Sequence, residues 1–259
     1  MPRVLRPAAD AVPVIAHVPH ASTHIPETVR RELLLSDAEL ADELLRLTDH
    51  FTDELFAGLA ELGSTRFVND LSRFVFDPER FLDDSAEPMA ARGQGVVYWQ
   101  GTQGQVVREA SAELRMRRIE ALYRPYHAAL DGLVGEMLEE AGACLVVDCH
   151  SFPTVPLPSE LDQAPGRPDI CLGTDPLHTP AALADALEAS FESEGFVVRR
   201  DAPYAGTFVP SGYYGRDRRV RSVMIEVRRG LYMYEATGRR RPGFADVGAA
   251  ITRAVGSAL

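Results

Sequence analysis

Cysteine is scarce in this 259-residue sequence, and a long apolar run is missing. Cys144, Cys149 and Cys171 form an odd set without CxxC spacing, which favours a reducing compartment over a disulfide framework. No apolar stretch approaches the ~20 residues that span a bilayer. The N-terminal segment also lacks the charged region, long apolar core and cleavage site of a signal peptide. These absences predict a cytoplasmic protein with no transmembrane segment.

Clustered positive charge is lacking as well. The formal net charge is -11, the sequence pI is near 5.1, and the arginines are spread along the chain. A nucleic acid is therefore not an expected partner. A small anionic substrate is not excluded, because a few buried arginines set the local potential whatever the overall charge. The sequence is compatible with a homo-oligomer.

The composition is that of a globular protein, with 46% hydrophobic and 25% charged residues. One domain over residues 1–259 is expected, because open α/β sheets of this length commonly share one core. Apolar runs predict strands at 12–18, 64–68, 73–76, 143–149, 169–172, 196–199 and 220–227. Periodic segments predict helices at 37–62 with a break near Thr48, 107–141 with a bend at Pro125, 180–194 and 244–259.

Strands that alternate with helices predict a three-layer αβα fold with a mostly parallel or mixed central sheet. Between the strand at 73–76 and the long helix, residues 77–105 are polar, contain glycine and proline, and show no clear periodicity. A loop of this length in a compact domain is commonly a lid or a binding loop. We therefore expect this segment to border the functional site.

Two histidines follow apolar runs that are typical of buried strands. His20 lies in HVPHAST and His150 in VVDCHSF, each just past a predicted strand. A single histidine in such a place is more often packed or exposed, but ligands gather at the carboxyl ends of parallel strands. Asp148, two residues before His150, projects to the same face and could orient the imidazole. The pair therefore predicts two metal ligands.

A hydrolytic zinc site needs three protein ligands and one open position for water. Asp53 in TDHFTDELF is the candidate for the third ligand, and Asp49 and His50 are the alternatives. A solvated helix face is the competing interpretation of Asp53. His17 forms an HxxH pair with His20, but it lies inside the predicted strand and is expected to be packed or to orient another group. The expected site is one Zn²⁺ ion with three ligands: His20, Asp53 and His150.

Glu226 lies among apolar residues in SVMIEVRRGLY, in a predicted central strand. A carboxylate is costly to bury without a partner, so its presence points to a metal-bound water, an arginine or a shared proton. Beside a metal-bound water it could accept a proton and pass it to the leaving nitrogen. The alternative interpretation is a buried salt bridge to Arg228 or Arg73.

Arg73 and Arg80 in LSRFVFDPER bring two guanidinium groups to the start of the long loop. One could stabilise an oxyanion, and the other could hold a substrate carboxylate with paired hydrogen bonds. Asp77, which lies between them, could orient one of the two. Surface salt bridges are the ordinary role of a single arginine, so it is the pair that carries the prediction.

Taken together, the segments resemble the N-formylglutamate amidohydrolase family. The resemblance covers about residues 12 to 235 and rests on five segments in order: PHAST, SRFVFDPER, YRPYH, VVDCHS and the run from PYAGTFVP to SVMIEVRRGLYM. Each segment alone is weakly specific, and the order of all five carries the resemblance. This family looks like a distant relative of the zinc carboxypeptidases and aspartoacylase. That relation implies a zinc-carboxypeptidase-like (phosphorylase/hydrolase-like) fold and a single zinc.

The resemblance also implies roles for individual residues. His20 and His150 match the histidines of the PHSG-like and D-x-H-S motifs, Asp53 the acidic residue of the early helix, and Glu226 the general base. Arg73 looks like the oxyanion arginine and Arg80 the arginine that holds the substrate carboxylate. The histidine of YRPYH is His127, and Gly206 and Tyr213 belong to a loop that could close over the substrate. The expected substrate-binding residues are Ser22, Arg80, His127, Gly206 and Tyr213.

Two departures from the family pattern stand out. Asp77-Pro78-Glu79-Arg80 occupies the place where the family often reads D-L-N-R, so an acid replaces an amide near the expected carboxylate clamp. Ser22 or Thr23 stands where the PHSG motif has glycine. These changes leave the prediction of a hydrolase intact, but they put N-formylglutamate itself in question as the substrate.

The expected reaction is hydrolysis of an N-formyl or N-acyl amino acid by metal-activated water, with Glu226 as the base. Two other classes of function compete with it. One is a metal-free sensor of a carboxylated metabolite, which a measurement of bound zinc would distinguish. The other is a serine hydrolase that uses Ser22 or Ser151, but the chain lacks a G-x-S-x-G elbow.

Overall fold

The computed structural model describes residues 2–8 and 11–259. Its main sheet has seven strands in the order β1-β3-β2-β4-β7-β5-β6, and four of the six neighbouring pairs are parallel. The strand bounds are β1 Arg3–Leu5, β2 Val14–Val18, β3 Thr65–Val68, β4 Cys144–Phe152, β5 Ile170–Gly173, β6 Val198–Arg200 and β7 Val220–Arg228. The expected mixed α/β fold with a mostly parallel sheet is confirmed, whereas the relation to zinc carboxypeptidases stays a prediction.

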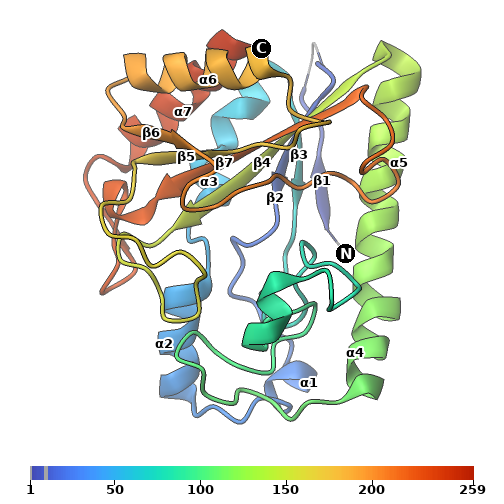
Figure 1. Cartoon of the computed structure of the whole chain (residues 1–259), viewed down its shortest axis with the longest axis vertical. Coiled ribbons are helices and arrows are strands. Elements are labelled where there is room, and N and C mark those ends of the chain that lie inside the picture. The colour runs from blue at the N-terminus through green and yellow to red at the C-terminus, as the bar shows by residue number, and fades with distance from the viewer. Residues whose placement is uncertain (1, 9–10) are drawn as a thin grey trace.

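Helices cover both faces of the sheet (Figure 1). The α-helices are α1 Glu27–Arg30, α2 Asp37–Leu47, α3 Thr52–Leu55, α4 Ala112–Arg118, α5 Arg124–Ala141, α6 Ala181–Ser193 and α7 Phe244–Ala258. Shorter elements are η1 Ala57–Leu62, η2 Pro88–Arg92, the π-helical η3 Ile119–Tyr123, η4 Arg229–Leu231 and a small hairpin of β8 Met233–Tyr234 and β9 Arg239–Arg240. No helix in the described residues is long and apolar enough to cross a membrane.

The alternation of side chains along β2 explains how the sheet is held between its two helical layers. Ala16 and Val18 point into a core shared with α3, α6 and α7, whereas Ile15 points into a core shared with α5. All nine residues of β4 are buried, as its continuous apolar run predicts for a central strand. The sheet therefore provides a buried base for the side chains at the ends of its strands.

The helical predictions are confirmed with local differences. Ser36 caps α2 through a capping box with Glu39, and the expected break follows at Thr48. The long helix begins at Ala112 rather than near 107. It widens into the π-helical turn η3 just before Pro125, whose ring nitrogen cannot donate the usual backbone hydrogen bond.

Two strand predictions need correction. Residues 73–76 form a turn instead of a strand, with the Val75 N–H donating to the Ser72 carbonyl at 2.8 Å. Phe74 and Phe76 are buried there, so the apolar run reflects core packing rather than extended backbone. The central strand β4 also continues three residues beyond the expected end, to Phe152. His150 therefore lies within the strand instead of after it.

Candidate active site

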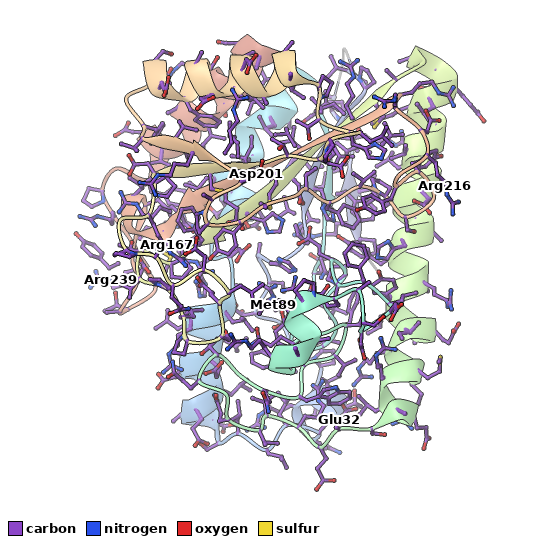
Figure 2. All side chains as sticks on the ribbon, viewed as in Figure 1. Glu32, Met89, Arg167, Asp201, Arg216 and Arg239 are labelled. Atoms are coloured by element: carbon purple, nitrogen blue, oxygen red, sulfur yellow. The ribbon has the colours of Figure 1, made fainter. Side chains whose placement is uncertain are left out.

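A cavity of about 440 Å³ opens where β2, β4 and β7 end. His20 follows β2 by two residues, and His150 on β4 pairs in register with Glu226 on β7. All three side chains line the cavity. Figure 2 labels Met89 on η2, which lines the cavity, and Arg167 on the loop after β4, a loop that contributes other lining residues. The structure thus brings together the two histidines and the carboxylate that the sequence placed far apart.

Carboxylates bind the same ring nitrogen of both histidines. His20 Nε2 lies 2.9 Å from Asp77 Oδ1, and His150 Nε2 lies 3.0 Å from Asp148 Oδ1 and 3.2 Å from Glu79 Oε1. In His20, a carboxylate at Nε2 favours the tautomer that is protonated there, which leaves the Nδ1 lone pair free. Nδ1 of His20 is buried and has no hydrogen-bond partner among the described residues. This orphaned nitrogen is what an imidazole prepared to bind a metal presents.

Asp49 supplies a carboxylate on the Nδ1 side of both rings. Its Oδ2 lies 3.0 Å from His150 Nδ1 and 3.8 Å from His20 Nδ1. Around zinc, ligand bonds of roughly 2.0–2.2 Å in a tetrahedron separate the donor atoms by roughly 3.2–3.6 Å, and the two distances from Asp49 lie close to that range. Asp49 Oδ1 accepts a hydrogen bond from Arg229 Nη2 at 3.0 Å, which orients the carboxylate.

Asp53, the expected third ligand, is placed differently. It lies on α3 and is half-buried, and it is neither among the residues that line the cavity nor within reach of the two histidines in the described chain. The other alternative, His50, has a buried Nε2 without a partner, and burial lowers its pKa. Of the three residues considered from the sequence, Asp49 is the one whose carboxylate approaches both imidazoles.

Glu79 is a second carboxylate close to the histidines. Its Oε2 lies 3.5 Å from His20 Nδ1, but its Oε1 lies 3.2 Å from Nε2 of His150, the nitrogen that Asp148 already contacts. Glu79, His20 and His150 together could hold a metal. Asp49 differs from Glu79 in that one of its oxygens approaches Nδ1 of both rings.

The electrostatics of the cluster favour a cation. Burial alone would raise the pKa of Asp77, yet Arg80, His20 and Arg73 outweigh that effect and hold the pKa well below its ordinary value. Burial would likewise lower the pKa of His150, but Asp148 and Glu79 outweigh it and raise the pKa well above the ordinary value. Ionised carboxylates around the imidazoles therefore create a site that is stabilised by positive charge.

Glu226 has few partners of its own. It is 8% exposed, its Oε2 has no hydrogen-bond partner in the part of the chain that the structure describes, and burial raises its pKa to about 8. The salt bridges considered from the sequence are absent among the described residues, since Arg228 pairs with Asp169 and Arg73 pairs with Asp77. A buried carboxylate that has no ion pair and faces a cavity is a candidate for proton transfer.

Asp77 organises the two arginines of the long loop. Its Oδ2 accepts hydrogen bonds from Arg73 Nη2 at 2.8 Å and from the Tyr98 hydroxyl at 2.6 Å, and Arg80 Nε lies 3.5 Å away. Arg80 also donates through Nε to the Gln94 carbonyl at 3.1 Å. Asp77 therefore orients both arginines, where the sequence predicted one of the two.

His17 is packed within β2, as expected for a residue inside a strand. Its Nδ1 lies 2.9 Å from Asp148 Oδ1, and its Nε2 lies 2.6 Å from the Tyr126 hydroxyl. Because the same Asp148 oxygen also contacts His150, this fully buried histidine fixes the carboxylate that orients His150. Asp148 thus has the orienting position that its spacing predicted.

Four residues expected to bind substrate lie outside the lining of the cavity: Ser22, His127, Gly206 and Tyr213. The Ser22 hydroxyl donates to the Asp70 carbonyl at 2.7 Å and so closes a local turn. Gly206 has a φ of 86° and lies one residue beyond Ala205, which does line the cavity. The Ser22 hydroxyl is therefore engaged in a hydrogen bond to the backbone, and Gly206 permits the left-handed turn beside the site.

The other two stabilise neighbouring segments. The Tyr213 hydroxyl donates to the Asp131 carbonyl on α5 at 3.3 Å. Nε2 of His127 lies 2.8 Å from the Pro78 carbonyl, between Asp77 and Glu79, and burial lowers the pKa of His127 to about 4. A neutral His127 therefore positions the turn that carries the arginines without touching the cavity.

Sequence reasoning missed Arg229 and most of the apolar wall. Arg229 is 3% exposed, and its Nη2 donates to Asp49. Arg228 and Arg229 are adjacent at the end of a strand, and nothing in the sequence shows which of the two side chains is buried. The missed apolar and aromatic lining residues are Met89, Tyr98, Leu157, Leu161, Tyr204 and Met224. Only the expected long loop pointed to Met89 and Tyr98.

Comparisons with known proteins agree with this geometry. Residues 12–233 match the family model of N-formylglutamate amidohydrolase. N-formylglutamate deformylases from Pseudomonas putida and Pseudomonas aeruginosa are 27% and 30% identical over 245 and 249 residues, which cover 91% of this chain and 87% of each relative. The mixed α/β fold and these matches define the class of protein, the amidohydrolases. Within that class, the chain belongs to the N-formylglutamate amidohydrolase family.

Solved structures extend the likeness to the fold. The crystal structure of N-formylglutamate amidohydrolase from Ralstonia eutropha JMP134 has a TM-score of 0.83 and 28% identity, covering 98% of this chain and 95% of that one. A protein from Agrobacterium tumefaciens has a TM-score of 0.69 and 24% identity, with 98% and 92% covered, and shows the same fold. The resemblance drawn from five sequence segments is confirmed.

Proposed function

We propose that the protein hydrolyses the amide bond of an N-formyl or N-acyl amino acid, with one Zn²⁺ ion held by His20, Asp49 and His150. The observation that carries the proposal is the buried Nδ1 of His20, which has no hydrogen-bond partner within residues 2–8 and 11–259 and lies 3.8 Å from Asp49 Oδ2. Two imidazoles and one carboxylate form a typical catalytic zinc set with one position left open. The deformylases named above supply the reaction class.

The bound ion would supply a Lewis acid that polarises the amide carbonyl and acidifies water. Glu226 is the residue proposed to accept the proton of the attacking water and to return it to the leaving nitrogen. Its raised pKa of about 8 reflects burial, and a nearby cation favours the ionised carboxylate that a base requires. Its position beside His150 in the β4–β7 register supports this role.

Arg73 and Arg80 are proposed to bind the two anionic groups of the reacting substrate. Both line the cavity, and both keep an Nη1 that donates to no protein acceptor in the described residues. Arg73 would stabilise the tetrahedral oxyanion, and Arg80 would hold the α-carboxylate. Because Asp77 fixes both side chains beforehand, little reorganisation is needed when charge develops.

The test is hydrolysis of N-formyl amino acids by chelator-treated and zinc-reconstituted protein. We expect activity to require about one zinc per chain, and Glu226→Gln to lower kcat by about 10³-fold while zinc content stays unchanged. Full activity without metal would contradict the proposal. So would near-normal turnover by a folded, zinc-loaded Glu226→Gln variant. A chain that binds carboxylates without zinc would instead fit the sensor hypothesis.

A further inference from the structure

Two of the three guanidinium nitrogens of Arg80 already have protein acceptors. Its Nε donates to the Gln94 carbonyl at 3.1 Å, and its Nη2 donates to the Tyr98 hydroxyl at 3.4 Å. Nη1 remains without a protein acceptor in the described part of the chain. A carboxylate presents two oxygens, and a paired contact to both is the strongest way to hold it. A second donor beside Nη1 would therefore complete the contact that Arg80 begins.

Gln94 carries a donor that the protein does not use. The residue lines the cavity and is 2% exposed, and its side-chain Nε2 is buried with no acceptor anywhere in residues 2–8 and 11–259. Buried donors without an acceptor are rare in folded proteins, and a bound ligand, ion or water is the usual reason for one. Because the carbonyl of the same residue accepts from Arg80, this unused donor lies on the residue that already contacts the arginine.

The backbone of Gln94 is fixed, although its side-chain amide is not. Its N–H donates to the Met89 carbonyl at 3.0 Å, its carbonyl accepts from Arg80, and the residue forms an isolated antiparallel bridge with Tyr98. The last torsion of a glutamine side chain has a broad range of allowed values. The amide of Gln94 can therefore turn toward a ligand in the cavity while the backbone that holds Arg80 stays in place.

We propose that Gln94 and Arg80 together bind the α-carboxylate of the substrate, with the Gln94 amide donating to one oxygen and Nη1 of Arg80 to the other. The inference rests on the proposed function and adds a residue that determines substrate specificity. Hydrogen bonds to an ionised acceptor are roughly twice as strong as those between neutral groups. A carboxamide in the same place has a single acceptor oxygen, so it satisfies one of the two donors and leaves the other without a partner.

The kinetic test uses Gln94→Leu, which nearly keeps the size of the side chain and removes the amide. With N-formylglutamate we expect KM to rise about tenfold or more and kcat to stay within about twofold, because the lost hydrogen bond forms in substrate and transition state alike. N-formylisoglutamine, in which the α-carboxylate is a carboxamide, should change by less than about threefold. N-formylglutamine keeps the α-carboxylate and should lose as much as N-formylglutamate. The matched control is Gln103→Leu, at an exposed position outside the cavity lining.

Unfolding experiments give a readout that separates binding from a structural role. An apolar side chain of similar size in place of a buried amide without a partner should leave the urea midpoint of the metal-free protein unchanged or higher. A lower midpoint for Gln94→Leu, with KM raised equally for all three substrates, would mean that Gln94 packs the loop. That result would overturn the inference.

Binding to the chelator-treated protein separates this inference from the proposed reaction. Calorimetry should give a Kd for N-formylglutamate that is about tenfold or more weaker in Gln94→Leu than in the wild type, with little change for N-formylisoglutamine. If the Kd shifts in this way but the zinc-loaded protein hydrolyses no N-formyl amino acid, the proposed reaction fails and the role of Gln94 stands. Hydrolysis with equal KM in both proteins would support the reaction and overturn the role of Gln94. A penalty that disappears with N-formylglutamine instead would overturn the assignment to the α-carboxylate.

Discussion

The two walls of the cavity are built by different physical means. The strand wall consists of β4 and β7, which carry His150 and Glu226 at positions fixed by a parallel register of nine residue pairs. The loop wall consists of residues 73–98, where isolated bridges and short turns replace a continuous ladder. Its functional side chains are instead held to one another through the charge of Asp77. Backbone pairing positions the first wall, and ion pairing positions the second.

This difference changes what a buried carboxylate does for stability. Asp77 in the loop wall neutralises two guanidinium groups, so its charge stabilises the fold. Glu226 in the strand wall forms no ion pair with any described residue, and burial raises its pKa to about 8, which disfavours its charge. The hydrogen bonds between β4 and β7 can hold Glu226 in place although its burial is destabilising. The loop wall, by contrast, depends on the charge of Asp77 for its own stability. Removing the two charges should therefore have opposite effects.

The largest expected effect is on Asp77→Asn. Loss of this charge leaves Arg73 and Arg80 buried without a counter-ion, and breaking a buried pair in this way costs about 3–5 kcal/mol. Denaturant unfolding of the metal-free protein measures the change. Asp70→Asn is the matched control, because Asp70 pairs with Arg3 at an exposed site and its loss should cost less than about 1 kcal/mol. Equal costs for the two variants would contradict the charge-held loop wall.

Glu226→Gln should instead stabilise the metal-free protein, by an amount that grows with pH. The unfolded chain releases this proton near pH 4.5 and the folded protein near pH 8. Between those values the folded state binds more protons, so wild-type stability falls as pH rises. An uncharged glutamine side chain at this position has no such dependence. At about 1.4 kcal/mol per pH unit, the variant should gain roughly 3 kcal/mol by pH 7.

Unfolding curves at pH 5 and pH 7.5 check this prediction. The difference in unfolding free energy between variant and wild type should be larger at the higher pH. Glu54→Gln, an exposed carboxylate on α3, controls for general charge effects and should show no such trend. A difference that shrinks with rising pH would mean that Glu226 is stabilised as an anion in the folded protein.

The strand wall could be read from the sequence, and most of the loop wall could not. Continuous apolar runs that end in polar groups located β4 and β7, and the parallel order then brought His150 next to Glu226. Local pattern carries that information because a strand exposes alternate residues at a fixed spacing. In the loop wall, Tyr98 reaches Asp77 across 21 residues of irregular chain, and no periodicity records such a contact.

The choice between Asp49 and Asp53 shows the same limit. Both are acidic residues four apart at a helix boundary, and the sequence cannot show where the helix breaks. Phe51 adopts a left-handed conformation with φ 67°, which ends the alignment of the two residues on one helical face. Asp49 thereby stays beside His20, whose carbonyl accepts its N–H at 3.1 Å, while Asp53 continues onto α3. A single backbone torsion therefore separates the carboxylate that contacts both imidazoles from the one that does not.

Metal-binding measurements on variants of both aspartates test the segment between α2 and α3, which belongs to neither the strand wall nor the loop wall. Asp49→Asn should weaken zinc binding by about 100-fold or more, because it removes a charged donor next to two imidazoles. Asp53→Asn is the matched control and should bind zinc like the wild type. Competition with a chromophoric chelator measures both affinities. The reverse order would restore Asp53 as the ligand and assign Asp49 to orienting His150 and Arg229.

The smallest expected effect concerns the support that α5 gives to the loop wall. His127 donates from Nε2 to the Pro78 carbonyl at 2.8 Å, and a buried hydrogen bond of this kind contributes about 1 kcal/mol. His127→Phe should lose about that amount in urea unfolding and lower kcat/KM severalfold, because the turn with Asp77 and Arg80 loosens. His127→Gln keeps a donor and should recover part of both losses. If His127→Phe behaves like the wild type and His127→Gln is the weaker variant, ring packing against Tyr123 rather than the hydrogen bond holds the turn.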